Sequence, residues 1–238
     1  MKALLVTQAR YGSSRFPGKI LKKIGNKTLL QIHLERLKRS KKVQHFMVAT
    51  TQEPEAASIV EIARMAGFDT YQGSLTDVLD RFYQAANGFN PDVVIRVTSD
   101  CPLNDGVLVD EMLEKFSQSG GDYLSNVLPP TFPDGLDIEL IKFSSLKKAW
   151  AEAKDPVERE HVTPYIYKRP NQFSIANFTS GRDLSKLRLT LDYPEDLALL
   201  TELIRVNGED KSWRDYVLAL ENNPGLRLLN SQFSRSGV

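Results

Sequence analysis

Strand-forming and helix-forming stretches alternate along the first half of the chain. Runs rich in apolar, β-branched and aromatic residues cover residues 2–7, 43–51, 69–72 and 92–98, as expected of short strands. Between them, apolar side chains recur at helical spacing over residues 28–38, over 54–67 and around 78–83. Strands that alternate with helices predict a mostly parallel, doubly wound α/β sheet.

This alternation changes after residue 126. We expect a helix over residues 105–119, a strand over 122–126 and a rigid, proline-rich turn over 129–135. Residues 136–141 alternate apolar and acidic side chains, which predicts an antiparallel or edge strand. Further helices are expected over 143–153 and 157–168, a last strand over 188–191, and helices from 194 and over 213–220. The expected organisation of residues 1–238 is one domain with an excursion at about 126–178 and a frayed end at 231–238.

Composition excludes several classes of partner. The 238 residues hold 31 Lys and Arg against 30 Asp and Glu, a net charge of +1, so no overall field attracts nucleic acid or a membrane surface. No apolar run approaches the roughly twenty residues that span a bilayer, so no membrane insertion is expected. Cys101 is the only cysteine, which excludes an internal disulfide, and it fits a small buried filler. With nothing resembling a signal peptide at the N-terminus, we expect a cytoplasmic protein.

The loop after the first predicted strand is rich in cations, hydroxyls and glycines. Residues 8–19, which we call the phosphate loop, read Gln-Ala-Arg-Tyr-Gly-Ser-Ser-Arg-Phe-Pro-Gly-Lys. Ligands bind at the carboxyl ends of strands in open α/β sheets, and Arg10, Arg15 and Lys19 suit a triphosphate. The alternative is a solvated basic turn. A Walker loop is excluded, because five residues separate the two glycines and Ile20 follows the lysine.

Polar residues also follow three other predicted strands. These are Thr50 and Thr51, Ser99 and Asp100, and Asp192. The carboxyl ends of parallel strands meet at one edge of a sheet, so we expect these groups to converge on one crevice. Mg²⁺ binds one or two carboxylates together with phosphates and water, which makes Asp100 and Asp192 the candidate metal ligands. Alternatively, Asp100 caps a turn and Asp192 caps the helix that Pro194 begins.

The phosphate loop closely resembles the Ala-Arg-x-x-Ser-x-Arg-x-Pro-x-Lys signature of the sugar-acid cytidylyltransferases, the family of CMP-sialate and CMP-KDO synthetases. The resemblance covers residue 1 to about residue 205 and is closest to the spore-coat polysaccharide (SpsF-like) branch. Blocks similar to that branch follow in the right order: residues 48–51, 73–81, 100–103, 134–139, 158–161 and 191–197. Many family members have Gly where this chain has Ser99.

The resemblance implies a Rossmann-like nucleotidyltransferase fold and a role for individual residues. The implied nucleotide-binding residues are Ala9, Arg10, Ser14, Lys19, Thr50, Arg81 and Ser99; the catalytic cations are Arg10, Arg15 and Lys19; the Mg²⁺ ligands are Asp100 and Asp192; and the acceptor-binding residues are Arg159 and His161. By the same resemblance, the excursion carries the acceptor pocket and the contact of a homodimer. A solvated charge cluster on a helix is the alternative for Arg159 and His161.

The implied activity is transfer of CMP from CTP to a sugar acid, with release of pyrophosphate, for surface polysaccharide biosynthesis. Two other classes are weighed against it. A glycosyltransferase on a similar sheet is expected to carry Asp-x-Asp at the metal strand, and Asp100-Cys101-Pro102 lacks it. A non-catalytic nucleotide-binding protein has no use for the two metal aspartates. Neither the cytosine preference nor the identity of the sugar acid follows from the sequence.

Overall fold

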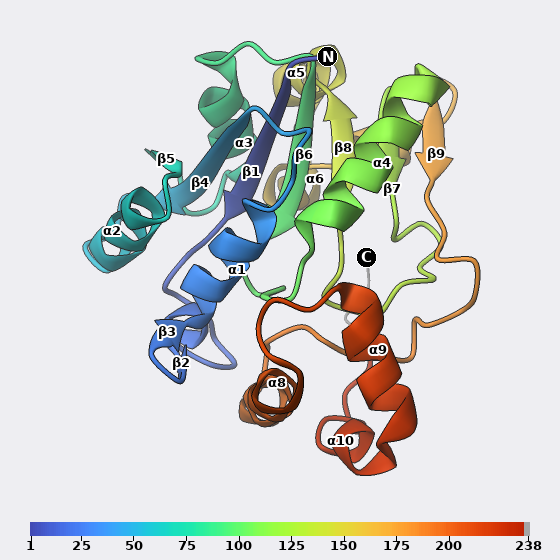
Figure 1. Ribbon diagram of the computed structural model, residues 1–238. Helices are drawn as coiled ribbons and strands as arrows, with labels where there is room; N and C mark the ends of the chain where they lie inside the picture. The colour runs from blue at the N-terminus through green and yellow to red at the C-terminus, as the bar shows by residue number, and fades with distance from the viewer. Residues whose placement is uncertain (236–238) are drawn as a thin grey trace.

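The structure, a computed structural model, describes residues 1–235 and is built around a seven-stranded sheet (Figure 1). The strands are β1 (Ala3–Gln8), β4 (His45–Thr51), β5 (Asp69–Gly73), β6 (Val93–Thr98), β7 (Tyr123–Ser125), β8 (Glu139–Lys142) and β9 (Ile175–Asn177), in the order β5-β4-β1-β6-β8-β7-β9. Only β8 runs antiparallel to its neighbours. The predicted mostly parallel α/β fold is confirmed, and the strand predicted to be antiparallel or at an edge is antiparallel and lies inside the sheet.

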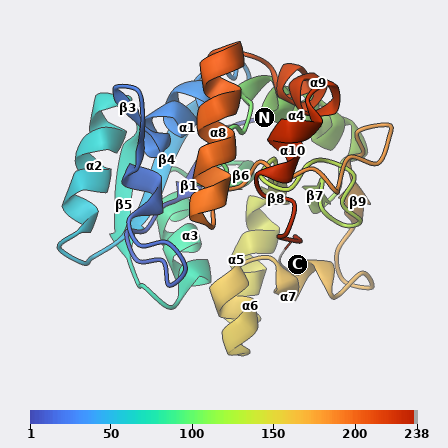
Figure 2. The ribbon, with the colours of Figure 1, turned by 90° about the horizontal axis from the view of Figure 1, so that it is seen from below.

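Helices cover both faces of the sheet (Figure 2). One face carries α1 (Leu29–Leu37), α2 (Ala56–Met65) and α4 (Gly106–Ser119). The helices α8 (Pro194–Asn207), α9 (Trp213–Asn222) and α10 (Pro224–Leu228) join the same core but lie beyond the lower ends of the strands in Figure 1. The other face carries α3 (Val78–Asn87), α5 (Phe143–Glu152), α6 (Pro156–His161) and α7 (Pro164–Tyr167). Alternate residues of β1 point to opposite cores, Ala3 and Leu5 to the first and Leu4 and Val6 to the second. Both faces of the sheet are therefore buried.

Several elements differ from the prediction. The strand expected at 188–191 is wrong: this extended segment forms only one isolated bridge, between Arg188 and Asp134. The helix expected at 157–168 is split, because Val162 has φ 72° and Pro164 starts a new helix. The 3₁₀ helix η1 (Lys19–Leu21), the hairpin of β2 (Lys23–Ile24) and β3 (Lys27–Thr28), β9 and α10 were not predicted.

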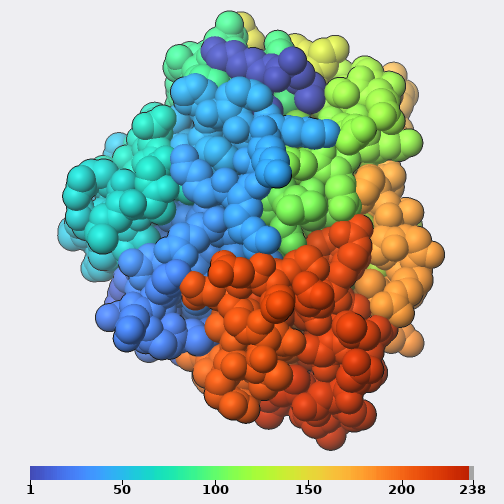
Figure 3. Space-filling model, in the orientation of Figure 1, coloured from blue at the N-terminus to red at the C-terminus, as the bar shows by residue number. Residues whose placement is uncertain are grey.

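Arg36 of α1 is buried, although the helical pattern places it on the exposed face with Lys38 and Arg39. Its side chain is 2% exposed, and its guanidinium donates to four carbonyl oxygens. They belong to Leu103, Asn104, Glu209 and Lys211. Arg36 therefore ties α1 to the segment that leads into α9, and the C-terminal helices close against α1 and α4 (Figure 3).

The described part of the C-terminal segment is not frayed. Phe233 stacks on Tyr193 with ring centroids 3.9 Å apart and an interplanar angle of 5°, and Arg235 forms an ion pair with Asp137. The expected fraying of 231–235 is therefore wrong, and residues 236–238 lie outside the described residues. Within residues 1–235, no helix has the length and apolar character needed to cross a membrane.

Candidate active site

A cavity of about 230 Å³ opens at the carboxyl ends of β1 and β6. This first cavity is lined by Gln8, Ala9, Arg10, Gly12, Ser13, Ser14, Arg15, Lys19, Ile20, Val78, Arg81, Arg96, Thr98, Ser99, Asp100, Glu160, His161 and Asp192. Every residue that the sequence predicted for the site is among them except Thr50, Thr51 and Arg159. The contact between Lys19 and Asp192 shows that segments more than 170 residues apart in the sequence meet at one edge of the sheet.

The end of the phosphate loop directs Lys19 into the first cavity. Gly18 has φ 64° and is the N-cap of η1, a backbone conformation that favours glycine. A Cβ atom at Gly18 would also lie 3.3 Å from the Tyr11 ring. The chain turns sharply there, and the Lys19 residue is 9% exposed although it carries a charge.

Lys19 joins the two predicted metal ligands. Its ammonium donates to Asp100 Oδ2 at 2.9 Å and to Asp192 Oδ1 at 2.8 Å, and Arg15 Nη2 lies 2.8 Å from the same Asp192 oxygen. Burial opposes both charged forms of the Lys19–Asp100 pair, but their mutual attraction prevails: the pKa of Lys19 is raised and that of Asp100 is lowered. Both groups are therefore charged at neutral pH.

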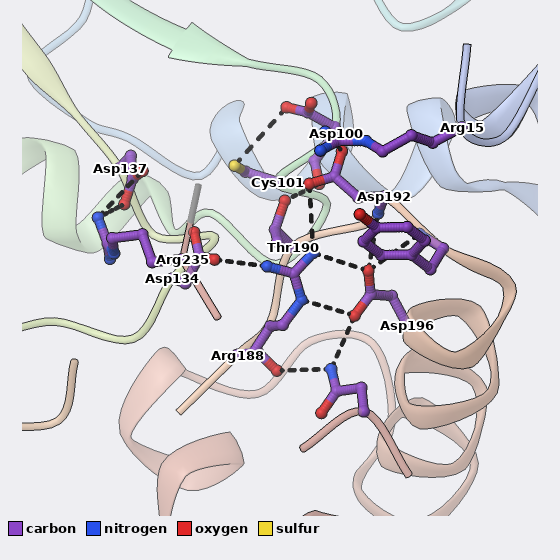
Figure 4. Close-up of polar contacts among 12 residues, drawn as sticks. Arg15, Asp100, Cys101, Asp134, Asp137, Arg188, Thr190, Asp192, Asp196 and Arg235 are labelled. Atoms are coloured by element: carbon purple, nitrogen blue, oxygen red, sulfur yellow. Dashed lines mark hydrogen bonds and ion pairs between the residues drawn. The ribbon is translucent and has the colours of Figure 1, made fainter. Parts of the chain in front are cut away.

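Arg188 holds Asp192 from the other side (Figure 4). Its guanidinium donates to Asp134 at 2.7 Å, to Asp192 Oδ2 at 3.2 Å and to Asp196 at 2.9 and 3.0 Å. Asn230 donates to Asp196 Oδ1 at 2.8 Å. A buried guanidinium shared by three carboxylates fixes the position of Asp192 more firmly than a surface ion pair does.

Asp192 does not cap the helix that follows it. The N-cap of α8 is Tyr193, and the Asp196 side chain accepts from the backbone N–H groups of Asp192 and Tyr193 at 2.8 and 3.0 Å. The capping alternative is therefore excluded for Asp192, whose Oδ1 faces cations instead.

Two backbone contacts bring the Asp192 segment beside Asp100. Thr190 Oγ1 and the Leu191 N–H both donate to the Asp100 carbonyl, at 3.1 and 2.8 Å. The turn at Gly135 packs against the same segment so closely that a Cβ atom there would lie 2.3 Å from Thr190 N. Because Gly135 has φ 101° and no room for a side chain, glycine is required at this position.

Two arginines of the first cavity have no acidic partner among residues 1–235. Arg10 is exposed and forms no ion pair there, while Arg81 is 2% exposed and donates only to the Ser74 carbonyl, at 2.6 Å. The buried Arg81 Nε atom has no hydrogen-bond partner in the described chain. Burial and the nearby Arg10 charge lower the pKa of Arg81 to about 10, so it stays charged at neutral pH. This side of the cavity is suited to an anion.

A second cavity of about 320 Å³ adjoins the first and shares Arg96, Thr98 and His161 with it. Asp137, Glu139, Thr163, Tyr167 and Lys168 are among its other lining residues. Arg96 pairs with Glu139, and its Nη2 donates to the side chain of Gln8 at 3.2 Å. Burial raises the pKa of Asp137 to about 7, although the nearby Arg235 opposes this shift.

Thr50 and Arg159 lie outside the first cavity. Thr50 is fully buried on β4, and its hydroxyl has no hydrogen-bond partner within the described chain. Arg159 Nε donates to Asp77 at 2.7 Å, and its Nη1 donates to the carbonyls of Trp150 and Ala153. These contacts hold α6 against α3 and α5, and the predicted binding roles of Thr50 and Arg159 stay predictions.

Three residues of the site, Arg96, Arg188 and Asp137, were not predicted from the sequence. Arg96 carried a usable signal, since a charged residue inside the apolar run Val93–Thr98 is unusual unless it serves a site. Asp137 was assigned only to the polar face of a strand, and nothing in the local pattern marks Arg188, whose partners are set by the tertiary fold.

The residues present fit a magnesium ion. Asp100 and Asp192 place two carboxylate oxygens within hydrogen-bonding distance of one Lys19 nitrogen, at the edge of a cavity suited to phosphates. Among residues 1–235 no cluster of three or more His, Cys, Asp or Glu side chains could hold a metal. Magnesium does not require one, because it commonly binds one or two carboxylates together with substrate phosphates and water.

A doubly wound sheet with an anion-binding cavity at the carboxyl ends of its strands is typical of the nucleotide-binding α/β proteins. Residues 4–219 match the sequence profile described as cytidylyltransferase, and the chain belongs to that family. The predicted family and the enzyme class, a CTP-dependent nucleotidyltransferase, are thereby confirmed.

Individual relatives agree with this assignment. An uncharacterized protein of Methanocaldococcus jannaschii is 39% identical over 97% of this chain and 95% of its own, and the spore coat polysaccharide biosynthesis protein SpsF of Bacillus subtilis is 31% identical over 93% and 95%. The structure of a cytidylyltransferase from Leptospira borgpetersenii superposes with a TM-score of 0.92 at 36% identity, covering 95% of this chain and 97% of that one. CMP:2-keto-3-deoxy-manno-octonic acid synthetase complexed with CTP shares the fold, with a TM-score of 0.65 at 17% identity over 87% and 99%.

Proposed function

We propose that the protein transfers CMP from CTP to a sugar acid, releases pyrophosphate and serves the biosynthesis of a surface polysaccharide. Two similar proteins support this choice of acceptor and pathway. One is the SpsF protein of Bacillus subtilis, and the other is the 3-deoxy-manno-octulosonate cytidylyltransferase of Trichlorobacter lovleyi, 26% identical over 100% of this chain and 94% of its own.

One observation carries the proposal: one side of the first cavity has two arginines without acidic partners in the described chain, and the other has two aspartates that share one ammonium. Arg10 and Arg81 lack acidic partners in the described chain, and Asp100 and Asp192 share a single ammonium. A nucleoside triphosphate that carries Mg²⁺ presents phosphate oxygens to the first pair and a cation to the second. A nucleotide without a metal would leave the two aspartates facing its phosphates.

In the proposed reaction, an oxygen of the acceptor attacks the α-phosphorus of CTP, and the bond from that phosphorus to the β-phosphate oxygen breaks. Arg10, Arg15 and Lys19 neutralise the charge that collects on the departing pyrophosphate. Asp100 and Asp192 would hold Mg²⁺, which would supply further charge neutralisation at the phosphates. The two cavities hold the reactants in line, which removes much of the entropic cost of the reaction.

The acceptor is proposed to bind in the second cavity. His161 and Arg96 line both cavities and therefore border the path from an acceptor to the α-phosphate. Lys168 supplies a cation for the carboxylate of the sugar acid. The carboxylate oxygens of Asp137 and Glu139 accept hydrogen bonds from the hydroxyl groups of the sugar acid.

Pyrophosphate release tests this function. Each of the four ribonucleoside triphosphates is incubated with Mg²⁺ and one of a panel of keto-acid sugars that includes 3-deoxy-manno-octulosonate. We expect release only with CTP and only in the presence of one sugar acid. Release that is independent of every acid, or that occurs equally with all four nucleotides, would contradict the proposal.

A further inference from the structure

The Lys19 ammonium lies between the two carboxylates proposed to hold Mg²⁺. It donates to Asp100 Oδ2 at 2.9 Å and to Asp192 Oδ1 at 2.8 Å. The side chains of Lys19 and Asp192 are 11% and 10% exposed, so solvent screens this contact weakly. A cation of the chain thus bridges the oxygens that a metal would take.

The second oxygen of Asp192 is already engaged. Arg188 Nη2 donates to Asp192 Oδ2 at 3.2 Å, and the same guanidinium is fixed by Asp134 and Asp196. Asp192 therefore offers Oδ1 to the first cavity, the oxygen that Lys19 and Arg15 contact.

The ammonium and a divalent ion compete for the same pair of oxygens. Mg²⁺ requires its oxygen ligands at about 2.0–2.1 Å in a near-octahedral arrangement, and two neighbouring cations repel each other.

We propose that Lys19 is the resident counter-ion of the metal site, and that it exchanges its two aspartates for nucleotide phosphates when Mg²⁺ enters. The proposal rests on the proposed function. It predicts that metal and nucleotide bind together and that Mg²⁺ alone binds weakly.

The charge balance explains this dependence. Mg²⁺ entering alone would leave the Lys19 ammonium beside a dication with both of its carboxylates taken. A triphosphate entering with the metal offers new anionic partners, and the flexible lysine stem can turn toward them. The metal separates the two aspartates from the phosphates, and the phosphates give the displaced ammonium new partners. Each ligand therefore binds more tightly when the other is present, and the two affinities are coupled reciprocally.

Binding of Mn²⁺, a paramagnetic substitute for Mg²⁺, tests the proposal without turnover. Free Mn²⁺ is measured by electron paramagnetic resonance with wild-type protein, alone and with α,β-methylene-CTP, which cannot release pyrophosphate. The measurement is repeated on Lys19→Met, which keeps the length of the side chain and removes its charge. Lys23→Met, at an exposed lysine outside both cavities, is the matched control.

We expect the analogue to tighten Mn²⁺ binding to the wild-type protein by at least about tenfold, or 1.4 kcal/mol. Lys19→Met should bind Mn²⁺ alone at least about tenfold more tightly than wild type does, and Lys23→Met should behave like wild type. Lys19→Gln replaces the first variant if its thermal melt shows a folding defect.

Two results would overturn the counter-ion role. One is nucleotide-free wild type that binds Mn²⁺ as tightly as it does with the analogue, a result that needs no variant. The other is a folded, neutral Lys19 variant that gains no affinity for Mn²⁺. If none of the proteins binds Mn²⁺ even with the analogue, the metal site and the proposed mechanism fail as well. If pyrophosphate release depends on the sugar acid but Mn²⁺ and the nucleotide bind independently, only the counter-ion role fails and the proposed function stands.

Discussion

At the scale of single residues, the site depends on the three cations that surround the Asp192 carboxylate. Lys19 and Arg15 contact its Oδ1 atom from the first cavity, and Arg188 contacts its Oδ2 atom from the protein interior. The cations differ in exposure: the Arg188 side chain is 5% exposed and that of Arg15 is 44% exposed. The buried Arg188 contact is suited to a permanent structural role, and the exposed Arg15 contact is suited to exchange with a ligand.

Lys19→Ala should weaken the binding of CTP more than that of CMP. The proposed mechanism places the Lys19 ammonium at the departing pyrophosphate, and a charge-assisted contact to a phosphate is typically among the strong ones. Calorimetry with both nucleotides in the presence of Mg²⁺ measures the difference. Equal losses for CTP and CMP, or no loss for either, would remove Lys19 from the triphosphate site.

Asp192→Asn should abolish turnover while the protein stays folded. Arg188 keeps its contacts to Asp134 and Asp196 in this variant, so the interior network survives, whereas the charge that holds the metal is lost. Turnover at saturating Mg²⁺ is measured beside a thermal melt, with the exposed Asp183→Asn as the control. A variant that melts like wild type and works at a comparable rate would show that Asp192 is not a metal ligand.

The residues of the site that could be predicted from the sequence are polar or charged residues that directly follow a predicted strand. The cations of the phosphate loop follow β1 directly, and Asp100 follows β6, so a correct strand assignment was enough to place them together. Arg188 was not predictable, because its three carboxylate partners come from segments that only the tertiary fold brings together.

At the scale of elements, α1 is joined to the turn that carries Asp100 through His33. This ring is fully buried, with Nδ1 3.0 Å from the Cys101 carbonyl and Nε2 2.9 Å from Thr7 Oγ1. A carbonyl can only accept, so the neutral ring donates from Nδ1 and accepts at Nε2. These two hydrogen bonds tie α1 to β1 and to the Asp100 turn.

His33 should make the protein sensitive to acid. Burial lowers its pKa from 6.5 to about 4, so below pH 6.5 the unfolded chain binds a proton that the folded chain does not. Stability is therefore lost as the pH falls from 6.5 toward 4, by about 2 kcal/mol between pH 7.5 and pH 5. Urea unfolding at these two values measures the loss.

The matched variants for this experiment are His33→Gln and His45→Gln, since His45 is exposed. His33→Gln should lower stability at pH 7.5, because a buried hydrogen bond is lost or distorted, and should reduce the further loss at pH 5. An unchanged difference between the two pH values in His33→Gln would contradict the assignment of the acid sensitivity to His33.

The order of the main elements was predictable, and the exceptions have physical reasons. Apolar runs and helical spacing located the central strands and the long helices, because these bury continuous apolar faces. The segment 188–191 has an apolar strand pattern yet forms no strand, since its N–H groups donate to the Asp134 and Asp100 carbonyls. The helix break at Val162 depends on one positive φ angle, which a β-branched residue does not signal.

At the scale of the whole molecule, the segment after residue 126 is part of the main sheet. Strands β8 and β9 pair with β6 and β7, and α5, α6 and α7 cover one face. The same segment lines the second cavity through residues such as Asp137 and His161. One body thus contains both proposed substrate sites.

We predict that the protein forms a homodimer through the segment from about residue 126 to 178. The motivation is the resemblance to the sugar-acid cytidylyltransferases together with the break in strand and helix alternation there. A stable pair should bury a large apolar interface. Sedimentation at tens of micromolar, about the range where a functional dimer should persist, measures the mass, and a monomer at that concentration would refute the prediction.

The central claim is that the acceptor attacks the α-phosphorus of CTP, and ³¹P nuclear magnetic resonance follows that bond directly. CTP, Mg²⁺, the protein and the sugar acid found in the pyrophosphate screen are observed over time. We predict equal amounts of pyrophosphate and a phosphodiester that links CMP to the acid, with neither formed when the acid or Mg²⁺ is omitted. Free CMP as the final product would indicate hydrolysis, and CDP with phosphate would indicate attack at the γ-phosphorus; either result would contradict the claim.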